Sequence, residues 1–109
     1  MNLNQLIYDI ILTYYVRGMR AYDTSIATNI RGSIGNVSKH FKDYYYFGKD
    51  KDIGYSAIRR RLEYLVKLEH IEEKEYNSRK YYEPKDKEKA FKRYLYIKAK
   101  NEELKKIDF

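Results

Sequence analysis

The stretch that decides the fold reads Ser56-Ala57-Ile58-Arg59-Arg60-Arg61-Leu62-Glu63-Tyr64-Leu65-Val66-Lys67-Leu68-Glu69-His70-Ile71. Its apolar residues recur at helical spacing, and the face that they share consists of Ile58, Leu62, Leu65 and Val66. Successive residues of a helix are rotated by about 100°, so the opposite face holds Ser56, Arg59, Arg60, Glu63 and Lys67. We therefore predict a helix over 56–69 with a core side and a basic side.

A β-hairpin is predicted directly after this helix. Residues 70–76 and 79–83 form two polar arms on either side of Asn77-Ser78, a pair of typical turn residues, and Pro84 closes the second arm. Because the arms are polar, we expect the hairpin to project from the body of the protein, with Arg79 and Lys80 near its tip.

Two helices are predicted upstream. The first carries an apolar stripe over 3–14 and ends near Gly18. The second starts at Asp23 or Thr24, either of which can cap a helix. Its apolar residues are Ile26, Ile30, Ile34, Val37 and Phe41. We expect the glycines of the segment 32–35 to break this second helix in two.

A last helix is predicted over 86–107. Its apolar positions alternate in steps of four and three residues, which is the spacing of a short coiled coil. The expected seam consists of Ala90, Tyr94, Ile97, Asn101 and Leu104. We expect this seam to join two copies of the chain, with the polar Asn101 fixing their register. In the alternative interpretation, the helix folds back over the first helix of its own chain.

Composition excludes several classes of protein. With 109 residues, the chain is long enough for one domain. It has no cysteine, which excludes disulfides, cysteine-ligated metals and thiol nucleophiles. His40 and His70 lie far apart in the sequence, so we expect no metal and no cofactor. The longest apolar run is too short to cross a membrane and no secretory signal is evident, so the expected location is cytoplasmic.

The chain is strongly basic. Its formal net charge of +7 favours a polyanionic partner such as nucleic acid, and residues 85–109 contribute the largest share of it. Fourteen tyrosines in a chain without tryptophan resemble the composition of proteins from hyperthermophilic archaea and their viruses. For a viral protein, the expected location would be the host cytoplasm.

In this order, the elements of residues 3–84 resemble the winged-helix DNA-binding family. The matching residues are Ser56 at the start of the helix, the basic run Arg59 to Arg61, the pair Leu62 and Leu65, and Ile71 at the start of the wing. The chain departs from the family in two ways. Glu69-His70 stands where a glycine is usual, and the segment before the basic helix is longer. The resemblance implies a mostly helical α+β fold, a winged helix-turn-helix domain over 1–84, and a C-terminal dimerisation helix over 85–109.

The expected function is sequence-specific binding of double-stranded DNA by a homodimeric transcriptional regulator without catalytic activity. Arginines on the outward face of a helix can read guanine in the major groove, and a helix N-terminus can bind a phosphate. Basic residues at a hairpin tip suit the DNA backbone or the minor groove. The expected DNA-binding residues are Ser56, Arg59, Arg60, Lys67, Arg79 and Lys80. No small-molecule ligand is evident.

Other functions remain open. The same scaffold could bind protein or serve a structural role. The segment Gly32-Ser33-Ile34-Gly35 resembles the Gly-x-x-Gly loop with which KH domains clamp RNA. Tyrosines can stack on unpaired bases. A lysine-rich last helix could lie on an anionic membrane, but its apolar residues follow a narrow coiled-coil seam, so we expect no membrane partner. A metal-dependent nuclease would require the convergence of Asp50, Asp52, Glu72 and Glu73.

Overall fold

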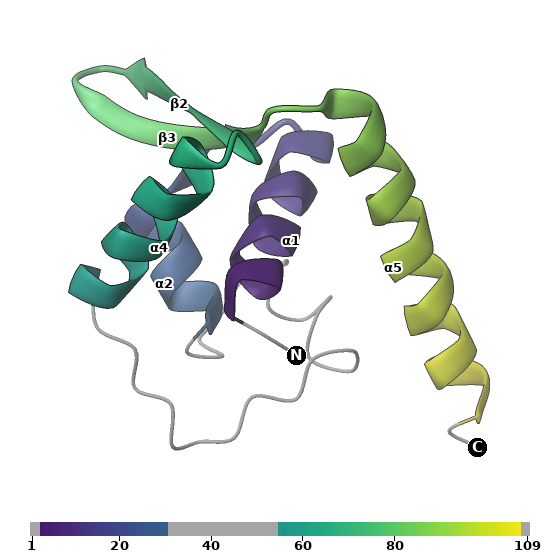
Figure 1. Cartoon of the computed structure of the whole chain (residues 1–109). Coiled ribbons are helices and arrows are strands. Elements are labelled where there is room, and N and C mark those ends of the chain that lie inside the picture. Colours follow the sequence, from purple (N-terminus) through teal and green to yellow (C-terminus); the bar gives the residue numbers. More distant parts are fainter. Residues whose placement is uncertain (1–2, 31–54, 108–109) are drawn as a thin grey trace.

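The computed structural model of the chain describes residues 3–30 and 55–107. In these two ranges, four α-helices and a three-stranded antiparallel sheet form a mostly helical α+β fold (Figure 1). The elements are α1 (Leu3–Val16), β1 (Ala21–Tyr22), α2 (Asp23–Ile30), α4 (Tyr55–Lys67), β2 (Ile71–Tyr76), β3 (Arg79–Pro84) and α5 (Lys87–Ile107). None of these helices is both long and apolar enough to cross a membrane.

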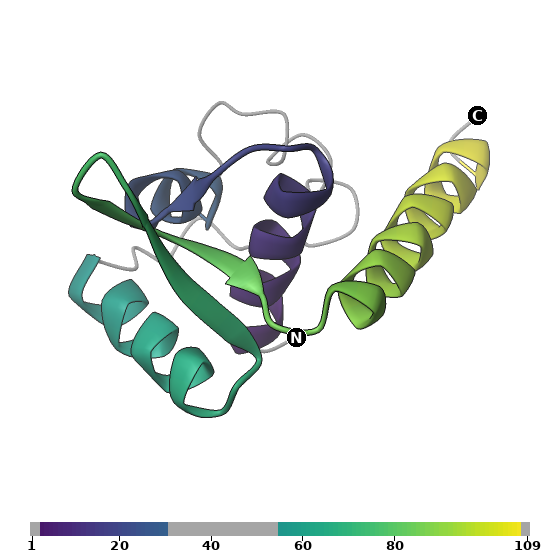
Figure 2. The same cartoon turned by 90° about the horizontal axis from the view of Figure 1, so that it is seen from above.

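Helix α1 lies at the centre of the core. The predicted apolar stripe is confirmed by its buried members, which are Leu6, Ile7, Ile10 and Ile11. Asp9 and Leu12, on the other side of the helix, are buried as well, and so is Thr13. Both sides are covered because α2 and α4 pack on one side of α1 and α5 packs on the other (Figure 2).

The remaining residues of the buried core cluster come from β1, α2, α4, β2 and α5. They are Ala21, Ile26, Ala27, Ile30, Ile58, Leu62, Leu65, Ile71 and Ile97. The second predicted helix is confirmed as far as α2 extends, and its apolar residues beyond Ile30 lie outside the described residues. At its start, the Asp23 carboxylate accepts a hydrogen bond from the Thr24 amide (2.7 Å) and so uses one of the free amides of the first turn.

The sheet has the order β1-β3-β2, and β2 and β3 form the hairpin that the sequence predicts. Ile71 pairs with Pro84 at the base of the hairpin and Tyr76 pairs with Arg79 at the tip. Asn77 and Ser78 both have positive φ angles, 49° and 64°, which is the requirement of a tight two-residue hairpin turn. The sequence did not predict strand β1, because two residues are too few to show an alternating pattern.

Helices α1 and α4 end in the same geometry. Gly18 follows α1 with a φ of 73°, and Glu69 follows α4 with a φ of 63°. In both places the amide of that residue donates to the carbonyl three residues earlier, and the next amide donates to the carbonyl five residues earlier. Glu69 therefore adopts the left-handed conformation that glycine usually supplies, and it turns the chain from α4 into the hairpin.

Helix α5 is attached to α1 by a buried ion pair as well as by apolar contacts. The Asp9 carboxylate, fully buried in the middle of α1, accepts two hydrogen bonds from the Arg93 guanidinium (2.9 and 3.1 Å). At the start of α5, the Lys87 ammonium donates to the Glu72 carboxylate (2.7 Å) and to the Pro84 carbonyl. The first half of α5 is thus fixed to both the central helix and the base of the hairpin.

Candidate nucleic-acid interface

Helix α4 has the two sides that the sequence predicts. Ile58, Leu62 and Leu65 are buried against the core. The residues on the opposite side are all exposed, namely Ser56, Arg59, Arg60, Glu63 and Lys67. We call this side the basic face of α4.

The three consecutive arginines of α4 have different surroundings. On one flank of the helix, the Arg59 Nε lies 3.5 Å from the Asp23 carboxylate of α2. On the other flank, the Arg61 guanidinium donates to the Asn4 side chain of α1 (3.3 Å). Arg60 lies between these flanks, and no ion-pair or hydrogen-bond partner of its side chain occurs in the described part of the chain. It is therefore the arginine best placed to bind an external group.

Glu63 also lies on the basic face. It stands one helical turn from both Arg59 and Lys67, and sequence reasoning did not count it among the binding residues. A carboxylate repels phosphate, yet it can accept a hydrogen bond from the amino group of cytosine. The basic face is thus a mixed surface with an excess of positive charge.

The hairpin presents Arg79 and Lys80 on opposite faces, because successive residues of a strand alternate. The Arg79 guanidinium donates to the Thr24 hydroxyl (3.1 Å) and lies over the ring of Tyr22, 4.2 Å from its centre. The Lys80 ammonium lies 3.3 Å from the Glu73 carboxylate on the other arm. Arg79 is therefore positioned by two contacts, whereas Lys80 is held by one exposed ion pair.

The first turn of α2 connects the hairpin tip with the basic face of α4. Arg59 reaches it through Asp23 and Arg79 reaches it through Thr24. On the hairpin face toward these helices, burial raises the pKa of the Tyr82 hydroxyl, and the nearby carboxylates of Glu73, Asp23 and Glu63 raise it further. The hairpin tip, the start of α2 and the start of α4 lie on one side of the molecule, and α5 lies on the other (Figures 1 and 2).

The outer face of the sheet carries an aromatic cluster that the sequence did not predict. The Arg20 guanidinium lies over the ring of Tyr76, 3.7 Å from its centre, and 5.7 Å from the centre of the Tyr81 ring. Tyr22 and Tyr81 meet edge to face, 6.1 Å apart. Strand alternation places residues 76, 79 and 81 on the same face of the hairpin. Residues 20 and 22 join this face only because β1 pairs with β3, which the sequence did not predict.

The predicted seam of the last helix lies only partly at the surface. Ala90 and Ile97 are fully buried in the core of their own chain, and Tyr94 is half-buried. Asn101 and Leu104 belong to α5, but their side chains lie outside the described residues. The first half of the helix thus packs over α1 of its own chain, as in the alternative interpretation of the sequence. Its exposed apolar residues are Phe91, Leu95 and Tyr96.

Of the residues of the other candidate sites, the structure describes only Glu72 and Glu73. Glu72 and Glu73 lie on opposite faces of β2, and Glu72 is engaged by Lys87. Asp50, Asp52 and the segment Gly32–Gly35 lie outside the described residues. Within 3–30 and 55–100, no three carboxylate, histidine or cysteine side chains cluster as metal ligands would.

The chain matches no family model, and comparisons with curated proteins and with solved structures find no significant match.

Proposed function

We propose that the protein binds double-stranded DNA in a sequence-specific manner and acts as a homodimeric transcriptional regulator of the winged-helix type. The observation that carries the proposal is that the hairpin tip and the start of α4 lie on one side of the molecule (Figure 1), where Arg79 and Arg59 both contact the first turn of α2. An α-helix fits the major groove of B-DNA, and a hairpin beside it can reach the adjacent backbone.

In this proposal, α4 reads the bases. Arg60 has no internal partner in the described part of the chain, and the exposed Arg59 has only a long contact to the partly buried Asp23 carboxylate, so both can turn toward guanine O6 and N7 at small cost. Ser56 at the start of the helix and Lys67 near its end are placed to bind phosphates on either side of the groove.

The hairpin contributes affinity without specificity. Arg79→Ala and Lys80→Ala are each expected to weaken binding to all duplexes alike, because each removes one phosphate contact. Each should also reduce the steepness with which the logarithm of the binding constant falls with the logarithm of the salt concentration, by about one unit. The matched control is Lys92→Ala on α5, whose ammonium pairs with Glu88 on the far side of the molecule. An unchanged salt slope in both hairpin variants would exclude the tip from the interface.

A dimer through α5 must use the outward side of that helix, because Ala90 and Ile97 already serve the core. Phe91 and Leu95 are about half exposed and lie one turn apart, so they can pack against a second copy. Phe91→Glu together with Leu95→Glu is expected to give a monomer in sedimentation with the fold retained. Removal of everything after Pro84 is a poorer test, since it would also uncover α1.

Selection of bound duplexes from a random library tests the central proposal. We expect enrichment of a short motif, arranged as a palindrome with half-sites about one helical turn apart if the protein binds as a dimer. Retention of duplexes without any enriched motif would show that binding is not sequence-specific.

A protein-interaction or structural role is the second candidate, since the exposed apolar residues of α5 and the tyrosines of the sheet also suit a protein partner. Titration of a labelled duplex at several salt concentrations distinguishes the two. DNA binding requires affinity that falls steeply with salt. If no duplex is bound even at low salt, the DNA proposal is wrong and the interaction role is favoured. Preference for a single-stranded RNA competitor would favour the RNA-binding alternative.

A further inference from the structure

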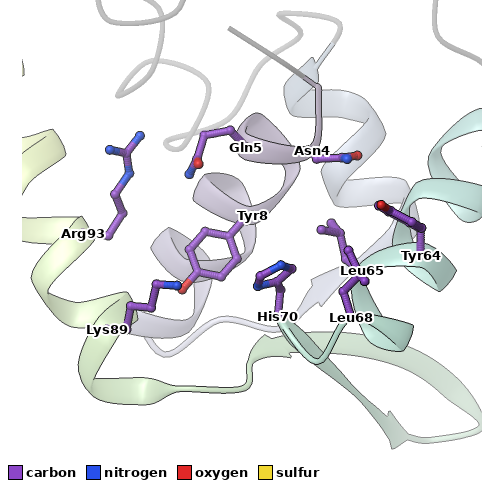
Figure 3. Close-up of a pocket in the computed structure, with 9 residues that line it drawn as sticks. All are labelled: Asn4, Gln5, Tyr8, Tyr64, Leu65, Leu68, His70, Lys89 and Arg93. Atoms are coloured by element: carbon purple, nitrogen blue, oxygen red, sulfur yellow. The ribbon is translucent and has the colours of Figure 1, made fainter.

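A pocket of about 350 Å³ lies on the molecule between α1, the end of α4, the start of the hairpin and α5 (Figure 3). It is set apart from the basic face of α4, because its residues on that helix lie on the flank toward α1. The nine residues that line it are Asn4, Gln5, Tyr8, Tyr64, Leu65, Leu68, His70, Lys89 and Arg93.

One side of the pocket is apolar and aromatic. Leu65 is buried and supplies part of the wall, while Leu68 and Tyr64 remain close to half exposed. Tyr8 projects from α1 into the space between α4 and α5 (Figure 3). Burial raises the pKa of its hydroxyl, so Tyr8 is neutral at physiological pH and can donate a hydrogen bond.

The other side is cationic. Lys89 and Arg93 come from successive turns of α5, and His70 comes from the start of the hairpin (Figure 3). Arg93 is already engaged by the buried Asp9 carboxylate. The ammonium of Lys89 and the imidazole of His70 have no hydrogen-bond or ion-pair partner within the described residues, and no carboxylate lines the pocket. Among the residues that line the pocket, positive charge therefore faces an apolar wall.

We propose that this pocket binds a small organic carboxylate with an apolar body about the size of one ring. The carboxylate pairs with Lys89 and His70, and the body packs against Leu65, Leu68 and the Tyr8 ring. A volume of about 350 Å³ is near the lower limit for ligand pockets, which favours a compact ligand over a nucleotide. The proposal does not depend on the binding of DNA by the basic face.

Titration of the full ¹⁵N-labelled chain with sodium benzoate at constant ionic strength tests the proposal. Benzamide, which has nearly the same shape without the charge, is the ligand control. We expect saturable amide shifts confined to residues 4–8, 64–70 and 89–93, and much weaker shifts with benzamide. Lys89→Gln is expected to weaken benzoate binding by on the order of tenfold, the usual loss for a hydrogen bond to a charged group.

Lys92→Gln is the matched protein control. Lys92 lies on the same helix and is exposed, but its ammonium pairs with Glu88 outside the pocket. Both variants change only exposed side chains, so both should retain the parent spectrum away from the substitution. The proposal is wrong if benzoate causes no saturable shifts up to its solubility limit, if benzamide binds as tightly, or if Lys92→Gln loses as much affinity as Lys89→Gln.

Discussion

Glu69 shows how one residue determines the path of the chain between the two proposed DNA-contacting elements. Its φ of 63° is in the left-handed region. A residue with a side chain is less stable than glycine in this conformation by about 1–2 kcal/mol. The hydrogen bonds of the helix end offset this cost by satisfying the last carbonyls of α4. Glu69 thus ends α4 with a backbone geometry that glycine more often supplies.

Glu69→Gly is expected to raise the free energy of unfolding by about 0.5–1 kcal/mol, because the relief of the left-handed backbone exceeds the extra chain entropy of glycine. Lys67→Gly, in the last turn of α4, is the control and should lower stability by about 0.5–1 kcal/mol. Urea denaturation measures both. If Glu69→Gly is also destabilised, then the geometry at residue 69 is not strained.

Arg60 carries a prediction about specificity. Arg60→Ala should weaken binding to the selected duplex by about 1–3 kcal/mol more than binding to random DNA, since the variant loses a bidentate contact to guanine. Arg61→Ala is a control of identical chemistry on the flank that contacts Asn4, and it should affect both duplexes equally. Fluorescence anisotropy at fixed salt gives both affinities. Equal losses on both duplexes for Arg60→Ala would assign it to the phosphates.

At the scale of elements, sequence patterns predict which residues are buried but not which surface buries them. The periodic stripes of α1 and α4 and the turn signal at Asn77-Ser78 were sufficient for these elements, because each pattern is local. The last helix shows the limit. Ala90 and Ile97 fit equally a seam between two copies and a contact with α1, since both place apolar residues at the same spacing.

The candidate site shows the same limit. The outward position of Arg59, Arg60 and Lys67 follows from helical rotation alone. The contact between Arg79 and Thr24 joins residues 55 positions apart, and it exists only because β1 and α2 lie beside the hairpin. No local pattern contains that information.

A buried ion pair contributes to the attachment of α5 to α1, together with apolar contacts. Arg93→Met should lower the free energy of unfolding by about 3 kcal/mol, because it leaves the buried Asp9 carboxylate without its charged partner. Lys92→Met removes only an exposed pair and should change stability by less than about 1 kcal/mol. Adding Asp9→Leu to Arg93→Met should restore much of the loss in thermal or urea denaturation. A double variant as unstable as the sum of its single variants would contradict this assignment.

At the scale of the whole molecule, the core limits stability at alkaline pH. Burial raises the pKa of Tyr8 and Tyr82 above 10.0, the ordinary tyrosine value, and neighbouring carboxylates add to both shifts. In the unfolded chain these hydroxyls ionise near the ordinary value, so the folded state binds more protons above it. Their contribution to stability is complete below pH 10 and is lost as the pH rises through the folded pKa.

Denaturation measured between pH of about 8 and about 11 should therefore show a fall in stability toward the alkaline end. Tyr8→Phe and Tyr82→Phe should each reduce that fall. Tyr64→Phe serves as the control, because its ring is half exposed. An alkaline fall of the same size in all three variants would show that other groups cause it.

The central position of α1 has a consequence for the order of folding. This helix is synthesised before the other described elements, yet one of its sides is covered by α5, which follows all of them in the chain. Until residues 93 and 97 have left the ribosome, the Asp9 carboxylate lacks its partner Arg93, and the apolar side of α1 that α5 later covers remains exposed. The hairpin and α4 can assemble earlier, but the core closes only after α5 has emerged. In this interval the nascent protein depends most on chaperones and is most open to proteases.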